Sequence, residues 1–258
     1  MDPTKVFSKP EIYQMMLDQI EKSGLGEVLR TGKGFDKLPR DKFGYVSAVD
    51  DVQSLMGHEF ARRNSGLPLE YGAINSYKGP DYKYINAVKR GTSNPKFGEP
   101  TEFHQKEADL LDQLLETGVD LPYDITVHRG LGKWENGPIQ KLFYQRSKGD
   151  EIGNLGFLST TIDPAIAEDF TSTMDPVKAI LEIPAGEKFI PVPGIERELL
   201  FKPKRTFEVL EIDPYKRSLR AKLKPGKIWS DTRNDRGRLI GGGALGALLM
   251  NEGDDDGE

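Results

Sequence analysis

The chain has 258 residues, of which 36% are hydrophobic and 30% charged, and its formal net charge is −5. This length suffices for one large domain or two small ones, and the acidic balance provides no bulk attraction toward nucleic acid or an anionic membrane. The absence of cysteine excludes disulfides, thiolate metal sites and a cysteine nucleophile, and three scattered histidines argue against a zinc site.

The first residues predict no targeting segment. They lack a basic stretch followed by an apolar core, so we expect no secretory signal. No apolar run in the chain approaches the ~20 residues that a membrane helix needs, so we also expect no membrane span.

The first half of the chain is predicted to be helical. Ser8 and Glu11 form a capping box at the start of an apolar stripe that ends at Gly24, which predicts a first helix. Similar signals predict three more helices, within residues 47–66, 79–91 and 101–118. In the third helix Asp81 is expected to cap the N-terminus, and in the fourth Phe103 is expected to lie on the apolar face.

From residue 121 the pattern changes to short β-rich runs separated by turn signals. Six strands are predicted, at residues 125–131, 156–161, 178–184, 198–201, 206–213 and 218–223. One helix interrupts them, because Asp163 is a favourable cap and Pro164 suits the first helical position. The short, proline-rich segment 187–195 is interpreted as a loop. The expected fold class is α+β, with a helical N-terminal part packed on a mixed or antiparallel β-sandwich.

The same change in composition suggests how the chain is organised. Residues 1–118 are expected to form the helical part, residues 119–226 the β-rich core, and residues 227–258 a glycine-rich and acidic tail. We expect the tail to be disordered or loosely docked, and the alternative is a docking segment for a partner. No pattern in the sequence indicates an oligomeric state.

The segment 193–201 has two glutamates on either side of one arginine. If these residues lie on a strand, Glu196 and Glu198 share one face and Arg197 points to the other. Two adjacent carboxylates repel each other, and one of them can be pushed toward protonation. The pair therefore indicates either a solvated sheet edge or a site that uses both groups.

Two further fragments form a pattern with these glutamates. Arg129 stands on a predicted strand directly before Gly130, and the hydroxyl triplet Ser159, Thr160 and Thr161 ends the next strand. Each fragment alone is usual for a surface charge, or for a strand that leads into a helix. Their order along the chain, with the glutamates last, makes the set more informative than any single member.

In this order and spacing, the chain resembles the mono-ADP-ribosyltransferases of the Arg/Ser-Thr-Ser/Glu-x-Glu class. Segments 157–170 and 196–213 are similar to the family's hydroxyl and catalytic segments, and 77–91 is similar to the short helix before the catalytic arginine in bacterial toxins. Thr161 departs conservatively from the third serine. The resemblance covers residues 70–213, and it implies an ADP-ribosyltransferase core that uses NAD as co-substrate and needs no metal.

The resemblance also implies how NAD would be handled. The reaction breaks the bond between nicotinamide and ribose through an oxocarbenium-like state. Glu198 would stabilise this charge and accept a hydrogen bond from the ribose 2′-hydroxyl, with Ser159 orienting the carboxylate. Arg129 would hold the pyrophosphate, with Gly130 beside it in the NAD-binding set.

Three more residues belong to the implied NAD site. Thr160 and Thr161 would support the strand or the nicotinamide ribose. Phe170 would stack on nicotinamide, and the alternative is that it belongs to the core of its short helix.

The acceptor is implied by Glu196. Family members with glutamate at this position usually modify an arginine side chain, because a carboxylate can hold a guanidinium and help to remove its proton. A protein arginine is therefore the expected acceptor, and nucleic acid is the less favoured alternative. The loop before Glu196 helps to select the target in this family, and here it carries Ile195 where an aromatic residue is common.

Two other functions stay open. One is an NAD glycohydrolase toxin, and the other is a catalytically degenerate virion or interaction protein. The expected location is the cytoplasm of a target cell. Phage delivery or expression in the host bacterium is the first hypothesis, and export as a bacterial effector is the second.

A basic run in residues 216–227 contains six lysines and arginines. We interpret it as one solvated strand face. The alternative is an electrostatic platform for an acidic partner or nucleic acid.

Overall fold

The structure is a computed structural model, and it describes residues 9–42, 46–64, 71–91, 98–131, 147–154, 156–171, 177–192, 194 and 197–228. Three features of the sequence analysis lie outside the described residues. These are the cap residue Ser8, the adjacent residues Ile195 and Glu196, and the tail from residue 229 onward.

The described helices are α1 (Lys9–Lys22), α2 (Leu25–Thr31), the 3-10 helix η1 (Phe35–Lys37), α3 (Ser47–Arg63), α4 (Tyr71–Lys78), α5 (Tyr82–Arg90), α6 (Glu102–Glu116) and α8 (Pro164–Asp169). The four helices predicted in the first half correspond to α1, α3, α5 and α6, and the interrupting helix corresponds to α8. Helices α2 and α4 were not predicted. Gly24, read as a stop signal, has φ 73° and redirects the chain straight into α2.

Two helix details differ from expectation. Asp81 does not cap α5 with its side chain, because its backbone is already helical, with φ −74° and ψ −13°. Phe103 is 50% exposed, so it lies off the apolar face of α6. That face is formed instead by the buried residues Leu111, Leu114 and Leu115.

The described strands are β1 (Val119–Asp120), β2 (Ile125–Leu131), β3 (Glu151–Asn154), β4 (Leu158–Thr161), β5 (Val177–Ile183), β6 (Lys188–Val192), β7 (Glu198–Phe201), β8 (Arg205–Asp213) and β9 (Ser218–Ile228). All six predicted strands are present. The segment interpreted as a loop contains β6 instead, in which Pro191 pairs with Leu199 of β7. Its buried apolar residues pack against the core, which outweighs the cost of a proline within a strand.

The strands follow one another in the order β1-β6-β7-β4-β2-β5-β9-β8-β3. Every described pair is antiparallel except β5 with β9, which is parallel. Strand β2 pairs with β5 over the full stretch from Ile125 to Leu131, but with β4 only through His128 and Thr161. The sheet therefore has two parts that meet at β2 and β4, and the expected mixed α+β fold is confirmed.

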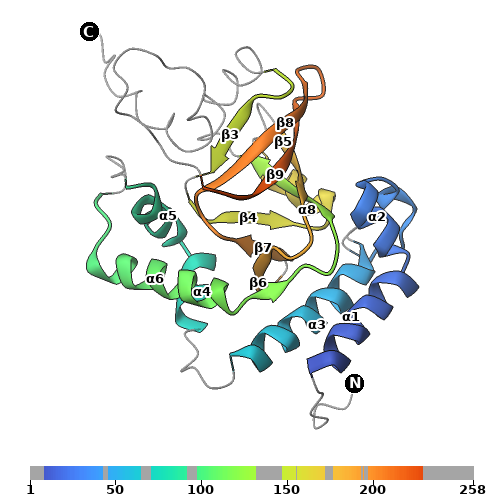
Figure 1. The fold of residues 1–258 in the computed structure, drawn as a ribbon, viewed down its shortest axis with the longest axis horizontal. Helices are drawn as coiled ribbons and strands as arrows, with labels where there is room; N and C mark the ends of the chain where they lie inside the picture. The colour runs from blue at the N-terminus through green and yellow to red at the C-terminus, as the bar shows by residue number, and fades with distance from the viewer. Residues whose placement is uncertain are drawn as a thin grey trace.

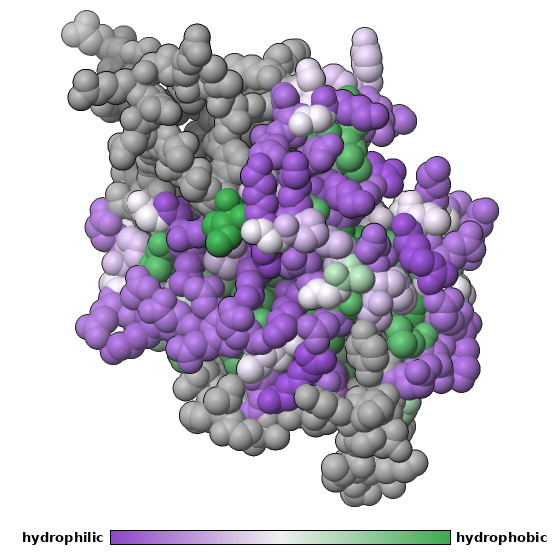
Figure 2. Space-filling model, in the orientation of Figure 1, coloured by the Kyte–Doolittle hydropathy of each residue, from purple (hydrophilic) through white to green (hydrophobic). Residues whose placement is uncertain are grey.

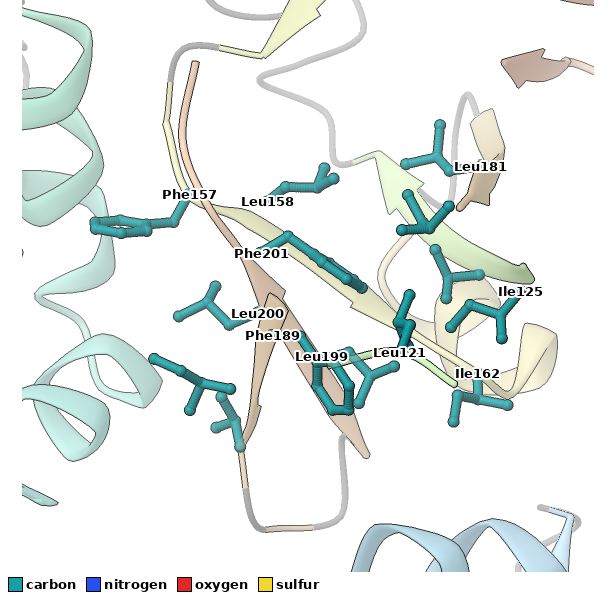
Figure 3. Close-up of a cluster of buried hydrophobic side chains, with 14 of the residues drawn as sticks. Leu121, Ile125, Phe157, Leu158, Ile162, Leu181, Phe189, Leu199, Leu200 and Phe201 are labelled. Atoms are coloured by element: carbon teal, nitrogen blue, oxygen red, sulfur yellow. The ribbon is translucent and has the colours of Figure 1, made fainter. Parts of the chain in front are cut away.

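The helices cover this sheet in two groups. Figure 1 shows α4, α5 and α6 beside β4, β6 and β7, with α1, α2 and α3 on the opposite side. One hydrophobic core joins helices and strands, running from Ile20 of α1 to Leu223 of β9. Within it, the ring centroids of Phe189 on β6 and Phe201 on β7 lie 5.9 Å apart. Figure 3 shows both residues among the buried hydrophobic side chains. Each such buried phenylalanine contributes about 1.5–3 kcal/mol to folding.

The surface is consistent with the polar composition. Figure 2 shows that one face is mainly hydrophilic, with hydrophobic residues in small scattered groups. Among the described helices, none has the length and apolar character needed to cross a membrane.

His128 of β2 is a titratable group within the fold. It is 7% exposed, and its ring meets that of Phe35 edge-on at 5.4 Å. Burial, together with the positive charge of Lys178, lowers the pKa of His128 to about 4. The imidazole is therefore neutral in the folded protein at neutral pH.

We expect this histidine to make folding sensitive to mild acid. The unfolded chain takes up the proton near pH 6.5 and the folded protein only near pH 4, so the unfolded state holds more protons in this window and stability falls as pH falls. Once the pH is below about 4, the free energy of unfolding should have fallen by about 3 kcal/mol. Denaturant unfolding of the wild type and His128→Leu at several pH values measures it. The variant should lose less stability than the wild type across the window, and identical losses would contradict the assignment.

Candidate active site

Adjacent strands bring the arginine, serine and glutamate positions together. Arg129 is on β2, Ser159 on β4 and Glu198 is the first residue of β7. Because β4 lies between β2 and β7, residues far apart in the sequence become neighbours. Arg129 Nη1 donates a hydrogen bond to the backbone carbonyl of Ser159 at 3.0 Å, and Glu198 pairs with Thr161 of β4.

Glu198 lies within the sheet and not at an exposed edge. It is only 4% exposed, and its backbone pairs with β4 on one side and with Val192 of β6 on the other. Gln53 Nε2 of α3 donates to the backbone carbonyl of Glu198 at 3.2 Å. A carboxylate in such a position acts strongly on nearby charge, since the effective dielectric constant is lower than in water.

The three hydroxyl residues have different surroundings. Thr160 is buried, and its Oγ1 donates to the carbonyl of Leu199 on β7 at 3.0 Å. Thr161 is also buried, and its Oγ1 accepts from the backbone N–H of Asp163 at 3.2 Å. Only Ser159 is partly exposed. Both threonine side chains thus hold the strand and the following turn, which leaves Ser159 as the accessible hydroxyl.

Gly130 is needed for the packing of α8 on β2. A Cβ atom at this position would lie 2.0 Å from the carbonyl oxygen of Ala167 and 2.8 Å from the carbonyl carbon of Phe170. No side chain fits in this space. Phe170 itself follows α8 and is 48% exposed, so its ring is not part of the core.

Tyr77 of α4 reaches the same region, and sequence reasoning missed it. Burial and the carboxylate of Glu198 raise the pKa of Tyr77, while the positive charge of Arg129 opposes this shift. The side chain of Tyr77 is buried. Its hydroxyl accepts from Asn86 Nδ2 at 3.1 Å, and Asn86 Oδ1 accepts from the backbone N–H of Phe157 at 2.7 Å.

The sequence contains a signal for this link. Asn86 stands on the buried side of α5 among apolar residues, and a buried polar group needs a partner. Gly156 lies two residues before β4, and a Cβ atom there would approach Asn86 Oδ1 to 2.6 Å. The two residues together predict contact between α5 and the start of β4.

The residue directly before Glu198 does not belong to a strand. Strand β7 begins only at Glu198, and Arg197 has φ 46°, in the left-handed region, which is not a strand conformation. The strand on which the alternation of side chains depends therefore does not extend to Arg197, and Glu196 lies outside the described residues. Arg197 is 4% exposed and forms ion pairs with aspartates of the N-terminal half.

Charges outside the motif are largely engaged in ion pairs. In the basic run 216–227, Lys224 pairs with Glu151 at 2.8 Å and Arg220 with Glu182 at 2.7 Å. This arrangement favours the solvated strand face over a platform for an acidic partner. In the described part of the chain, no group of three or more histidines or carboxylates could hold a metal ion.

A comparison with protein families identifies the family of the chain. The sequence model of the ADP-ribosyltransferase exoenzyme family matches residues 62–228, which is more than half of the chain. The chain belongs to this family. Its members are ADP-ribosyltransferases that use NAD as co-substrate, and the match includes the arginine, serine and glutamate strands described above. No match was found among curated protein sequences.

Solved structures of ADP-ribosyltransferases share the fold. The Vis toxin of Vibrio splendidus is 19% identical with a TM-score of 0.54, over 76% of this chain and 93% of that one. The C3 exoenzyme of Clostridium limosum is 20% identical with a TM-score of 0.52, over 68% of this chain and 94% of that one. The BECa toxin of C. perfringens, solved with NADH, is 19% identical with a TM-score of 0.53, over 72% of this chain and 50% of that one.

Gly130→Ala is expected to destabilise the ADP-ribosyltransferase fold. The added methyl group would collide with the backbone of α8, so the helix must move away from β2, at a cost of about 1–3 kcal/mol. Thermal unfolding measures this cost. Gly57→Ala in α3 is the matched control, because nothing lies within 4 Å of its Cβ position, and it should gain ~0.5–1 kcal/mol. Equal melting temperatures for Gly130→Ala and the wild type would refute the close packing.

Proposed function

We propose that this chain cleaves NAD between nicotinamide and ribose, releases nicotinamide and transfers ADP-ribose to arginine side chains of a protein. The observation that carries the proposal is the Arg129–Ser159 hydrogen bond between β2 and β4, with the buried Glu198 on β7, the next strand. In the proposed site, the guanidinium would bind phosphate and the carboxylate would stabilise a cationic sugar. Family membership supports the transferase class, and the geometry supports these residues as its site.

Glu198 is the proposed catalytic residue for NAD cleavage. The ribose becomes positively charged as nicotinamide leaves, and a carboxylate held in place beside it stabilises that charge. The pairing of Glu198 with β4 and β6 restricts its movement, so little reorganisation is needed during the reaction. Tyr77 is a further proposed member of the site, since Asn86 joins its hydroxyl to Phe157, directly before β4, and the Glu198 carboxylate contributes to its raised pKa.

Arg129 and Ser159 are the proposed binding and orienting residues. A guanidinium matches the oxygens of a pyrophosphate in charge and in planar geometry. The hydrogen bond from Arg129 to the backbone of β4 orients the guanidinium before the substrate binds. Ser159 would orient Glu198 and contact NAD. Thr160 and Thr161 support the strands through their backbone contacts, and the half-exposed Phe170 is available to stack on nicotinamide.

Glu196 is the proposed residue for the acceptor. Its carboxylate would bind the guanidinium of the target arginine and assist its deprotonation. Support comes from a relative: the Vis ADP-ribosyltransferase was solved in complex with agmatine, which carries the same guanidinium group. That enzyme is 18% identical to this chain, with a TM-score of 0.50. The proposed place of action is the cytoplasm of a target cell, reached through a phage or by export as an effector.

Glu198→Gln tests the cleavage role. The variant keeps the size of the side chain, but it removes the charge and replaces one acceptor oxygen with an NH2 donor, so NAD cleavage should fall about 10²–10³-fold. NAD labelled in the ADP-ribose is incubated with the protein and a cell lysate, and nicotinamide and labelled protein are measured. Glu211→Gln, on an exposed position of β8, is the control and should keep full activity. Free ADP-ribose without labelled protein would identify a glycohydrolase, and no cleavage by the wild type would identify a degenerate protein.

Glu196→Gln tests the acceptor role. Transfer to agmatine and to protein arginine should be lost, whereas cleavage of NAD with water as acceptor should largely remain, because Glu198 is untouched. The ratio of transferred to hydrolysed ADP-ribose is the measurement. If both rates fall by the same factor, the two glutamates do not divide the work in this way.

A further inference from the structure

Arg197, directly before the proposed catalytic glutamate, has an uncommon environment. It is 4% exposed although it carries a full charge, and its φ of 46° is one that residues other than glycine, asparagine and aspartate seldom adopt. Both features are unfavourable alone. A buried charge and a strained backbone persist only where the surroundings hold them in place.

The surroundings consist of aspartates from three separate segments. Asp50, in the first turn of α3, accepts from Arg197 Nε at 2.6 Å and from Nη2 at 2.5 Å, which is a bidentate pair. Asp41 accepts from Nη2 at 3.1 Å, and Asp163 lies 3.5 Å from Nη1. The carbonyl of Val46 accepts from Nη1 at 3.1 Å. We call Arg197 with these three aspartates the Arg197 cluster.

The cluster is connected to the sheet through Asp163. This residue is fully buried, caps α8 through the N–H of Ala165, and accepts from the backbone N–H of Val46 at 2.6 Å. Its own N–H donates to Thr161 Oγ1, and Thr161 is the strand partner of Glu198. The side-chain and backbone contacts thus form a closed ring around the start of β7.

Helix α3 makes a second contact with the same place. Gln53 follows Asp50 by one helical turn, is 8% exposed, and donates to the carbonyls of Val192 at 3.0 Å and Glu198 at 3.2 Å. Val192 ends β6 and Glu198 begins β7. Helix α3 therefore holds both ends of the connection between these strands, once through Gln53 and once through Arg197.

We propose that Arg197 is a positioning residue that, through Asp50 of α3, sets where β7 begins and so where the Glu198 carboxylate lies. Residues 47–61 of α3 precede the region that matches the family, so the positioning device comes from outside the matched segment. The inference rests on the proposed role of Glu198 in NAD cleavage. The inference gives the N-terminal helical part a role in positioning the active site, although Asp41 and Asp50, its residues in the Arg197 cluster, do not belong to the motif.

Arg197→Asn is the decisive variant. Asparagine accepts the left-handed backbone but lacks the guanidinium, so the change removes the cluster without adding strain. We expect kcat for NAD cleavage to fall at least about tenfold, with KM for NAD within about twofold, because Arg129 and Ser159 are unchanged. Arg197→Lys keeps the charge without the bidentate fork and should recover part of kcat. Arg220→Gln, which breaks the ion pair between β9 and Glu182 of β5 and leaves the Arg197 cluster intact, should leave both constants unchanged.

A double variant tests the connection to α3. Asp50→Asn alone should lower kcat in the same direction, and combined with Arg197→Asn it should add little, because both changes break one unit. Gln53→Met removes the hydrogen bonds from Gln53 to Val192 and Glu198 and keeps a similar side-chain volume. It therefore tests the role of α3 independently if circular dichroism shows that Arg197→Asn does not fold. Full kcat in folded Arg197→Asn, or a raised KM at unchanged kcat, would overturn this inference but would leave the proposed function standing. A wild type that does not cleave NAD would overturn the proposed function as well.

Discussion

Thr161 pairs with Glu198 on one side of β4 and with His128 on the other, and this double pairing joins the two parts of the sheet. Strands β1, β6, β7 and β4 continue from one side of it, and β2, β5, β9, β8 and β3 from the other. Arg129 follows His128 directly, so the arginine and glutamate strands can approach only where this junction holds them. The third hydroxyl position of the motif is thus a structural joint, and its side chain faces the cap of α8.

The helical part and the sheet depend on each other at this joint. Their apolar residues form one core, and polar contacts from α3 end at the backbone of β6 and β7. The hydrogen bonds from Asn86 to Tyr77 and from Phe157 to Asn86 likewise join α4 and α5 to the start of β4. Both ends of the central strands are therefore supported by helices. A sheet fragment without its helices would leave buried carbonyls and N–H groups without partners, which is costly.

Patterns within short segments of the sequence predicted those helices and strands that local interactions determine. Alternating apolar residues and turn signals located six strands, and capping and stop signals located five of the described helices. Helix α2 was not predicted because Gly24, which was interpreted as the end of α1, also begins α2. Strand β6 was not predicted because Pro191 favours a loop, whereas the burial that stabilises the strand depends on tertiary contacts. The arginine, serine and glutamate positions were found through spacing and resemblance. The roles of Tyr77, Gln53 and Arg197 depend on contacts more than 70 residues apart or on a left-handed backbone, which no periodicity encodes.

The buried charges at the start of β7 lower the stability of the fold but fix its local geometry. Removing an arginine and an aspartate from water costs several kcal/mol for each ion, and ion pairing in the interior rarely recovers more than this cost. Apolar replacement of a buried ion pair is often neutral for stability, but it has no directional preference. At Asp163 it would also leave the N–H groups of Val46 and Ala165 without their acceptor. A bidentate guanidinium and a capping carboxylate fix distances and angles, which apolar contacts do not. Since the cluster directly precedes a buried carboxylate, this directional control lies where a small displacement would matter most for a reaction at Glu198.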